Sequence, residues 1–149
     1  MLRFSASHTE GLVMCAVAAG RDVGADVERA LDRAPLDIAD RFFTSQEAEA
    51  IRASNGAEQT LSFFTHWTLK ESYIKARGLG LSLPMNKFSF HLASGASPSL
   101  HIDPGLGDHA AGWHFFPLQP TQFHCAAVCI RNLEKPNVCI ATDWDQMSH

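Results

Sequence analysis

The spacing of apolar residues predicts a pair of strands near the start of the chain. An unbroken apolar run over residues 11–19 is typical of a buried strand, and residues 23–28 alternate between apolar and polar or small side chains. Gly20, Arg21 and Asp22 separate the two segments and are typical of a turn. We therefore expect the two strands to form a hairpin.

Helical spacing follows in three segments. Residues 37–43 place apolar side chains three to four positions apart, and Thr44 with Glu47 has the spacing of a capping box that begins a second, short helix. The strongest signal covers residues 58–77, and Gly78 follows as the expected stop. The regularly spaced apolar residues of this long helix are Leu61, Phe64, Trp67, Leu69 and Ile74.

Short strands dominate the second half of the chain. They are expected after a loop that ends at Pro84, over residues 87–92, 99–102, 113–117 and 123–130. Residues 132–149 are expected to form a C-terminal tail, with one more strand over residues 138–142 as an open alternative. This order of elements predicts an α+β fold, in which an antiparallel sheet packs with the long helix in one domain over residues 1–131.

Composition narrows the functional classes. The chain has 149 residues, 46% of them apolar, and 12 basic against 16 acidic residues give a net charge of −4. That balance argues against nucleic-acid binding, because phosphate neutralisation needs clustered cations. No apolar stretch is long enough to span a bilayer or to form the core of a signal peptide, so we expect a cytoplasmic protein with no membrane partner. The four cysteines form no C-x-x-C pair, and we expect buried free thiols.

Two carboxylates stand two positions apart on the expected strand over residues 23–28. Asp26 and Glu28 share one face of that strand, and we expect Val23, Ala25 and Val27 to face the core on the other side. Adjacent carboxylates repel each other unless a cation lies between them, and oxygen ligands of this kind suit Mg²⁺. The alternative is an ordinary solvated strand face.

The long helix and the N-terminal segment supply further candidates. Glu71 and Lys75 are four positions apart and share one helix face, where they can be a metal ligand beside a phosphate-binding cation or an ordinary exposed ion pair. Ser7 and His8, followed by Thr9, can donate hydrogen bonds to a phosphate or lie in a polar surface turn.

Taken together, these motifs occur in a distinctive order. The chain reads F-x-x-S-H over residues 4–8, G-x-D-x-E over residues 24–28, W-x-x-K-E over residues 67–71 and G-x-G-L-S-L-P over residues 78–84. With RFFTSQE over residues 41–47, the series resembles the 4'-phosphopantetheinyl transferase family, specifically the C-terminal lobe of its two-lobed, surfactin-synthetase-activating class. The resemblance is strong from residue 4 to about residue 92 and weakens toward residue 130.

This resemblance implies a function and a role for each matching residue. Members move the phosphopantetheine arm of coenzyme A onto a serine of an acyl or peptidyl carrier protein and use Mg²⁺. The metal ligands would be Asp26, Glu28 and Glu71. Glu71, or a water bound to the metal, would also take the serine proton, and Lys75 would act at the phosphates. The residues expected to bind coenzyme A are Ser7, His8, Lys70 and Lys75, with His8 at the 3'-phosphate.

The two-lobed class carries a further lobe ahead of its F-x-x-S-H motif, where this chain has three residues. One hypothesis is an active transferase that replaces the missing surface by forming a homo-oligomer, with a dimer favoured over a trimer. Its interface would use apolar residues of segments 11–28, 87–92 and 123–130. The other is a pseudoenzyme or coenzyme A/Mg²⁺-binding protein without transferase activity. Arg41 and Arg77 are candidate contacts for the carrier protein.

Overall fold

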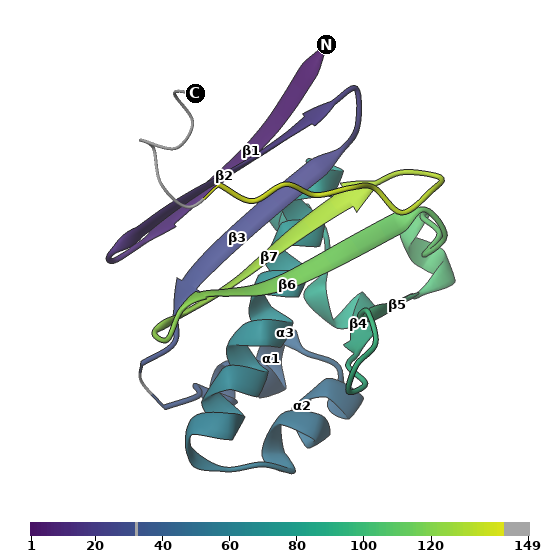
Figure 1. The fold of residues 1–149 in the computed structure, drawn as a ribbon. Helices are drawn as coiled ribbons and strands as arrows, with labels where there is room; N and C mark the ends of the chain where they lie inside the picture. The colour runs from purple at the N-terminus through teal and green to yellow at the C-terminus, as the bar shows by residue number, and fades with distance from the viewer. Residues whose placement is uncertain (32, 142–149) are drawn as a thin grey trace.

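An antiparallel hairpin begins the chain in the computed structural model, which describes residues 1–31 and 33–141 (Figure 1). Strands β1 (Leu2–Thr9) and β2 (Leu12–Ala19) form it, with Thr9 opposite Leu12. The expected pairing of residues 11–19 with 23–28 is therefore wrong. The chain reverses at Glu10 and Gly11. The φ of Gly11 is 83°, a conformation that glycine adopts readily because it has no side chain.

A three-stranded antiparallel sheet follows, in the order β3-β7-β6. Strand β3 (Val23–Arg29) lies at one edge, β7 (His124–Arg131) in the centre and β6 (Trp113–Thr121) at the other edge. Strand β6 runs beyond its expected end because an edge strand tolerates prolines, here Pro117 and Pro120. Strands β4 (Phe88–His91) and β5 (Ser99–Ile102) form a separate hairpin.

The helices follow the sequence signals closely. They are α1 (Leu36–Phe42), α2 (Ser45–Arg52) and α3 (Gly56–Arg77), with short 3-10 turns at Gly80–Ser82, Met85–Lys87 and Pro104–Leu106. The capping box is confirmed, since Thr44 and Glu47 each accept a hydrogen bond from the backbone of the other. Gly78 ends α3 in the left-handed conformation, also as expected.

Helix α3 lies across one face of the three-stranded sheet, so the α+β fold with a long helix on an antiparallel sheet is confirmed (Figure 1). Tyr73 of α3 lies at the centre of the main core, where its ring packs against the aromatic side chains of Phe88 and Trp113. A second core forms where α1 and α2 meet α3, around Phe43 and Phe63.

Several smaller expectations are corrected or limited. Cys125 and Cys129 are buried free thiols as expected, whereas Cys15 and Cys139 are exposed. Residues 138–141 form no strand, and residue 142 of that expected strand lies outside the described residues. Across the described ranges, no helix combines the length and apolar character needed to cross a membrane.

A buried ion pair joins α2, α3 and β4. Lys70 has no solvent-exposed surface, and its Nζ donates to Glu47 Oε2 at 2.9 Å, to the Met85 carbonyl at 2.6 Å and to the Phe88 carbonyl at 2.5 Å. The other oxygen of Glu47 accepts the Phe90 N–H at 2.9 Å. Burial lowers the pKa of Lys70, and the charge of Glu47 opposes that shift. The ammonium thus uses its three protons inside the protein.

We predict that Lys70→Met costs about 3–5 kcal/mol of unfolding free energy, because it leaves the buried Glu47 charge without its partner. Urea denaturation measures this cost. The matched control is Lys87→Met, because the Lys87–Asp103 pair is exposed and its loss should leave stability nearly unchanged. Equal effects of the two substitutions would contradict the structural role of Lys70.

Candidate functional site

A close contact between β3 and α3 shapes the site. Gly24 is buried against the helix, and a Cβ atom built there would lie 1.8 Å from the Ser72 carbonyl oxygen and 2.7 Å from the Ala76 nitrogen. Neither backbone atom can move independently, so only glycine allows this approach. Because side chains alternate along a strand, Asp26 and Glu28 share the helix-facing side with Gly24.

The opposite face of β3 is also buried. Val23, Ala25 and Val27 are 0–7% exposed, and Asp26 is only 4% exposed. The expectation that these three residues face the core is confirmed, and the alternative of an ordinary solvated strand face for the carboxylates is incorrect for Asp26. Both faces are covered, with α3 on the carboxylate side, which explains why the charge of Asp26 needs a partner.

That partner is Lys75. Its Nζ lies 2.9 Å from Asp26 Oδ1 and 3.0 Å from the Ala25 carbonyl oxygen. Ser7 donates a second hydrogen bond to Asp26 Oδ1 at 3.1 Å. Among the described residues, the buried Oδ2 of Asp26 has no hydrogen-bond partner. Burial raises the pKa of Asp26, although Lys75 and Ser7 act in the opposite direction.

The charge of Asp26 affects the pKa values of both Glu28 and Glu71. Burial raises the pKa of Glu28, and the Asp26 and Glu71 charges raise it further. Burial likewise raises the pKa of Glu71, with a further contribution from Asp26, while Lys75 lowers it. The structure therefore brings together the strand and helix carboxylates that the sequence pattern predicted.

These carboxylates are near one another without forming a closed ligand cage. In the part of the chain that the structure describes, no group of three His, Cys, Asp or Glu side chains is close enough to hold a metal ion as it stands. Mg²⁺ needs only one or two protein carboxylates, since it keeps several of its waters. The donor set fits that ion, because its ligands are all oxygens and Asp26 Oδ2 is a buried acceptor without a donor.

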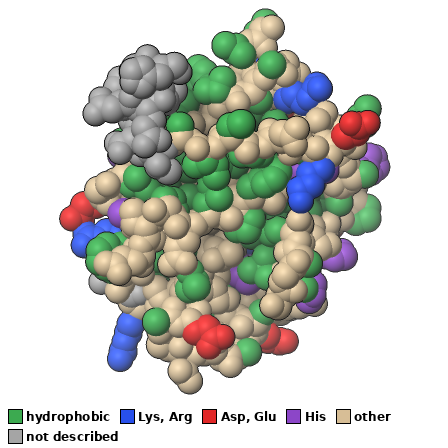
Figure 2. Space-filling view, in the orientation of Figure 1, with side chains coloured by type: hydrophobic (Ala, Val, Ile, Leu, Met, Phe, Trp, Pro, Cys, Tyr) green, Lys and Arg blue, Asp and Glu red, His purple; other side chains and the backbone are tan. Residues whose placement is uncertain are grey.

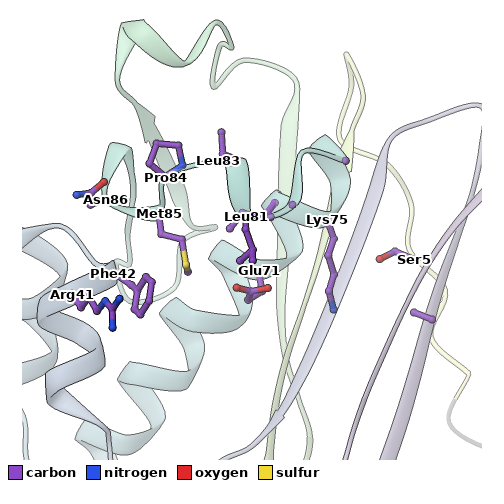
Figure 3. Close-up of a pocket in the computed structure, with 14 residues that line it drawn as sticks. Ser5, Arg41, Phe42, Glu71, Lys75, Leu81, Leu83, Pro84, Met85 and Asn86 are labelled. Atoms are coloured by element: carbon purple, nitrogen blue, oxygen red, sulfur yellow. The ribbon is translucent and has the colours of Figure 1, made fainter.

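A pocket of about 720 Å³ opens beside these residues. Figure 3 shows Glu71 at its centre, with Lys75 extending from α3 toward Ser5 on β1 and with Arg41 and Phe42 on the opposite wall. Segment 78–86 supplies much of the rest of the lining through Leu81, Leu83, Pro84, Met85 and Asn86. Sequence reasoning did not identify Phe42 or these loop residues as lining. The available signal was the RFFTSQE segment for Phe42 and the G-x-G-L-S-L-P segment for Leu81, Leu83 and Pro84, and Met85 and Asn86 come directly after the second segment.

The N-terminal pair divides between two faces of β1. Ser7 points to β3 and contacts Asp26, whereas His8 is exposed on the other face of the strand. The structure thus brings Ser7, but not His8, into contact with the carboxylate group. The alternative of a polar surface turn is incorrect, because the segment is a strand, and strand alternation separates the two side chains.

Lys70 does not belong to this site. Its neighbour in sequence, Glu71, lines the pocket, whereas the ammonium of Lys70 is enclosed with Glu47. The expected role in coenzyme A binding is not compatible with a side chain that has no exposed surface and no free donor. We assign Lys70 to the stability of the fold.

Comparisons with known proteins agree with this arrangement. The family model of the 4'-phosphopantetheinyl transferase superfamily matches residues 22–129. A 4'-phosphopantetheinyl transferase of Bacillus subtilis is 36% identical over 104 residues, which are 70% of this chain and 46% of that protein. The 4'-phosphopantetheinyl transferase HetI of Nostoc is 31% identical over 130 residues, 87% of this chain and 52% of that protein. This chain therefore spans about half the length of these relatives.

Solved structures support the likeness of fold. A holo-(acyl-carrier-protein) synthase from Bacillus anthracis in complex with CoA (3',5'-ADP) aligns with a TM-score of 0.63 and 15% identity, over 76% of this chain and 96% of that one. The Helicobacter pylori holo-[acyl-carrier-protein] synthase in complex with coenzyme A aligns with a TM-score of 0.58 and 15% identity, over 74% of this chain and 99% of that one.

We predict that Gly24→Ala disrupts the site through the helix contact. The new methyl group must push α3 away from β3, which should cost about 3 kcal/mol or more in urea denaturation. Gly105→Ala is the matched control, because Gly105 is exposed and its Cβ would meet only the end of the Asp103 side chain, at 3.3 Å. A Gly24→Ala protein as stable as the control would show that the helix and strand are not in the close contact described.

Proposed function

The chain belongs to the 4'-phosphopantetheinyl transferase superfamily, and from this premise we propose that it transfers 4'-phosphopantetheine from coenzyme A to a serine of an acyl or peptidyl carrier protein, with Mg²⁺. The observation that carries the proposal is the Asp26–Lys75 pair, held beside Glu28 and Glu71 at the edge of the pocket. The complexes of the B. anthracis and H. pylori synthases with coenzyme A or its 3',5'-ADP part support the choice of substrate.

The proposed metal ligands are Asp26, Glu28 and Glu71. Asp26 contributes its unpaired Oδ2, and the two glutamates have raised pKa values from burial and mutual repulsion, an energetic cost that a cation would relieve. Mg²⁺ bound there would neutralise charge on the pyrophosphate oxygens of coenzyme A.

Lys75 is proposed to bind a phosphate oxygen. An ammonium has three N–H donors, and Lys75 uses two of them on Asp26 Oδ1 and the Ala25 carbonyl. The third remains for a ligand, and the side chain is 32% exposed where it lines the pocket. The two protein contacts also fix the ammonium in place, so little side-chain entropy would be lost on binding.

Glu71 is the proposed general base. The serine Oγ of the carrier protein attacks the β-phosphorus of coenzyme A, the bond from that phosphorus to 3',5'-ADP breaks, and the serine proton passes to Glu71. Burial and the Asp26 charge raise the pKa of Glu71 in the metal-free chain, whereas a bound Mg²⁺ would lower it, so a water bound to the metal is the alternative base. Glu71 lines the pocket, where a carrier serine can reach it (Figure 3).

The outer face of the β1–β2 hairpin is proposed to pair with a second copy of the chain. Strand register places one set of residues on this face: Leu2, Phe4, Ala6 and His8 from β1, and Val13, Cys15, Val17 and Ala19 from β2. All except His8 are apolar, and Phe4 and Val13 are 74% and 78% exposed. An apolar face of this kind is typical of an interface.

The other expected interface segments do not contribute in the same way. Phe88 and Phe90 of β4 and Cys125, Ala127 and Cys129 of β7 are buried in the core, so β2 presents the main exposed apolar surface within the three segments. Strand β1, the other half of the hairpin, lies outside the expected segments. Figure 2 shows hydrophobic side chains gathered over the strands on the visible face of the molecule. A two-fold dimer is the commonest closed arrangement, and we propose it over a trimer.

Such a dimer gives His8 a place in the reaction. His8 lies within the proposed interface, so coenzyme A bound in a cleft between two copies could place its 3'-phosphate at His8 and its pyrophosphate near Lys75.

A second candidate function is binding of coenzyme A and Mg²⁺ without transfer. The observation that favours it is the carboxylate geometry, because within residues 1–31 and 33–141 no three His, Cys, Asp or Glu side chains are close enough to hold a metal ion as they stand. A site that holds its metal ion loosely can bind a ligand but position it poorly for attack, and positioning carries much of the catalytic effect in phosphoryl transfer.

We predict that the purified chain, with Mg²⁺ and coenzyme A, increases the mass of an apo carrier protein by one phosphopantetheine group. Mass spectrometry measures the increase, and chelation of Mg²⁺ should abolish it. Lys75→Met should lower the rate at least about 100-fold, because charge stabilisation by a single group is worth that much. Lys87→Met, which removes an exposed lysine outside this pocket, should leave the rate unchanged. No mass increase, together with a Mg²⁺-dependent rise of Tm on adding coenzyme A, would support the second function.

We also predict a dimer in sedimentation velocity at micromolar concentrations. Val13→Lys should convert it to monomer, because it places a charge within the proposed apolar interface, at a residue that is 78% exposed. Leu133→Lys is the control, since Leu133 is 98% exposed and lies outside the hairpin. A wild-type chain that stays monomeric at high micromolar concentration would rule out this interface, and a trimer would change its symmetry.

A further inference from the structure

Two serine hydroxyls take the place of backbone pairing between β1 and β3. The described residues show no backbone ladder between these strands, although they lie side by side (Figure 1). Instead, Ser5 Oγ accepts the Ala25 N–H at 3.0 Å, and Ser7 Oγ accepts the Val27 N–H at 3.2 Å. The hydroxyls therefore satisfy alternate N–H groups on the edge of β3, on either side of Asp26 in the sequence.

Ser7 differs from Ser5 in one respect. Besides accepting from Val27, its hydroxyl donates to Asp26 Oδ1 at 3.1 Å. A hydroxyl has a single proton, so Ser7 cannot donate to Asp26 and to a phosphate oxygen at the same time. The phosphate contact that the family resemblance implies for this residue competes with the contact in the structure.

We propose that Ser7 is a positioning residue that holds the Asp26 carboxylate for metal binding and does not itself bind phosphate. The inference rests on the proposed function, because it assigns a role in that same site. Ser7 and Lys75 together bind Oδ1, which fixes the rotation of the carboxylate and keeps Oδ2 as the free acceptor. Partners that orient a metal ligand in this way commonly contribute 10–100-fold to metal affinity.

The geometry provides an internal control. Ser5 lies two residues away on the same face of β1 and makes the same kind of bond to a β3 backbone N–H, but within the described part of the chain it makes no hydrogen bond to a carboxylate. Loss of either hydroxyl removes one hydrogen bond between the hairpin and β3. Only loss of the Ser7 hydroxyl frees Asp26 to rotate, so a difference between the two variants isolates the positioning effect.

The first measurement is the affinity for Mn²⁺, used as a probe for Mg²⁺ and titrated by electron paramagnetic resonance. Ser7→Ala should weaken Mn²⁺ binding about 10-fold or more, whereas Ser7→Thr, which keeps a hydroxyl, should restore most of the affinity. Ser5→Ala should stay within about twofold of wild type. Equal Mn²⁺ affinities for the Ser7→Ala and Ser5→Ala proteins would overturn the proposal, as would a wild-type protein that binds no Mn²⁺.

The second measurement compares coenzyme A with 3'-dephospho-coenzyme A as donors. If Ser7 acts through Asp26, Ser7→Ala lowers kcat/KM by the same factor for both donors, because neither loses a contact to the substituted residue. A loss seen with coenzyme A but not with the dephospho form would assign Ser7 to the 3'-phosphate and overturn the proposal. Absence of transfer in wild type, with the Mn²⁺ results as expected, would reject the proposed transferase function and leave the positioning role intact.

Discussion

The missing side chain at Gly24 is the constraint on which the rest of the site depends. It lets α3 approach β3 so closely that a Cβ atom would overlap the Ser72 carbonyl. Glu71 and Lys75 directly precede the two contacting residues of the helix, and Asp26 follows Gly24 by one strand period, so a single contact sets the distance between the acidic and basic groups. Without it, each side chain would keep its local orientation and lose its partner.

The pairings that could be predicted from sequence are those within one element. Asp26 with Glu28 follows from the strand period, and Glu71 with Lys75 from the helical turn. No local pattern predicts where β3 crosses α3. The crossing depends on the contact between Gly24 and the Ser72 carbonyl, which lies 48 positions later in the sequence. The α+β class, the capping box and the end of α3 were predictable because short-range chemistry determines each of them.

The wrong predictions from sequence have a common cause, which is that local patterns allowed more than one structure. Two turn-like segments, at residues 10–11 and 20–22, could each have formed the first hairpin, and residues 2–9 were too polar on one face to be recognised as a strand. That polarity has a physical explanation, because Ser5 and Ser7 do not face solvent but satisfy the edge of β3. Lys70 was misassigned for a similar reason, since its partner Glu47 lies on another helix.

Hydrogen-bond saturation separates structural from functional charges in this protein. Lys70 donates to three acceptors, so its ammonium has no N–H left for a ligand. Asp108 Oδ2 accepts from Tyr73, Arg77 and Trp113 at 2.6–2.9 Å, and all three donors belong to the fold. Among the residues that the structure describes, one N–H donor of Lys75 and one carboxylate oxygen of Asp26 have no hydrogen-bond partner. A buried carboxylate oxygen without a hydrogen-bond donor lowers the stability of the fold. A cation that binds to such an oxygen removes this free-energy cost, which favours binding. This unsatisfied capacity at two adjacent charges of opposite sign is the feature that supports the proposal of a magnesium-bound pyrophosphate at this part of the fold.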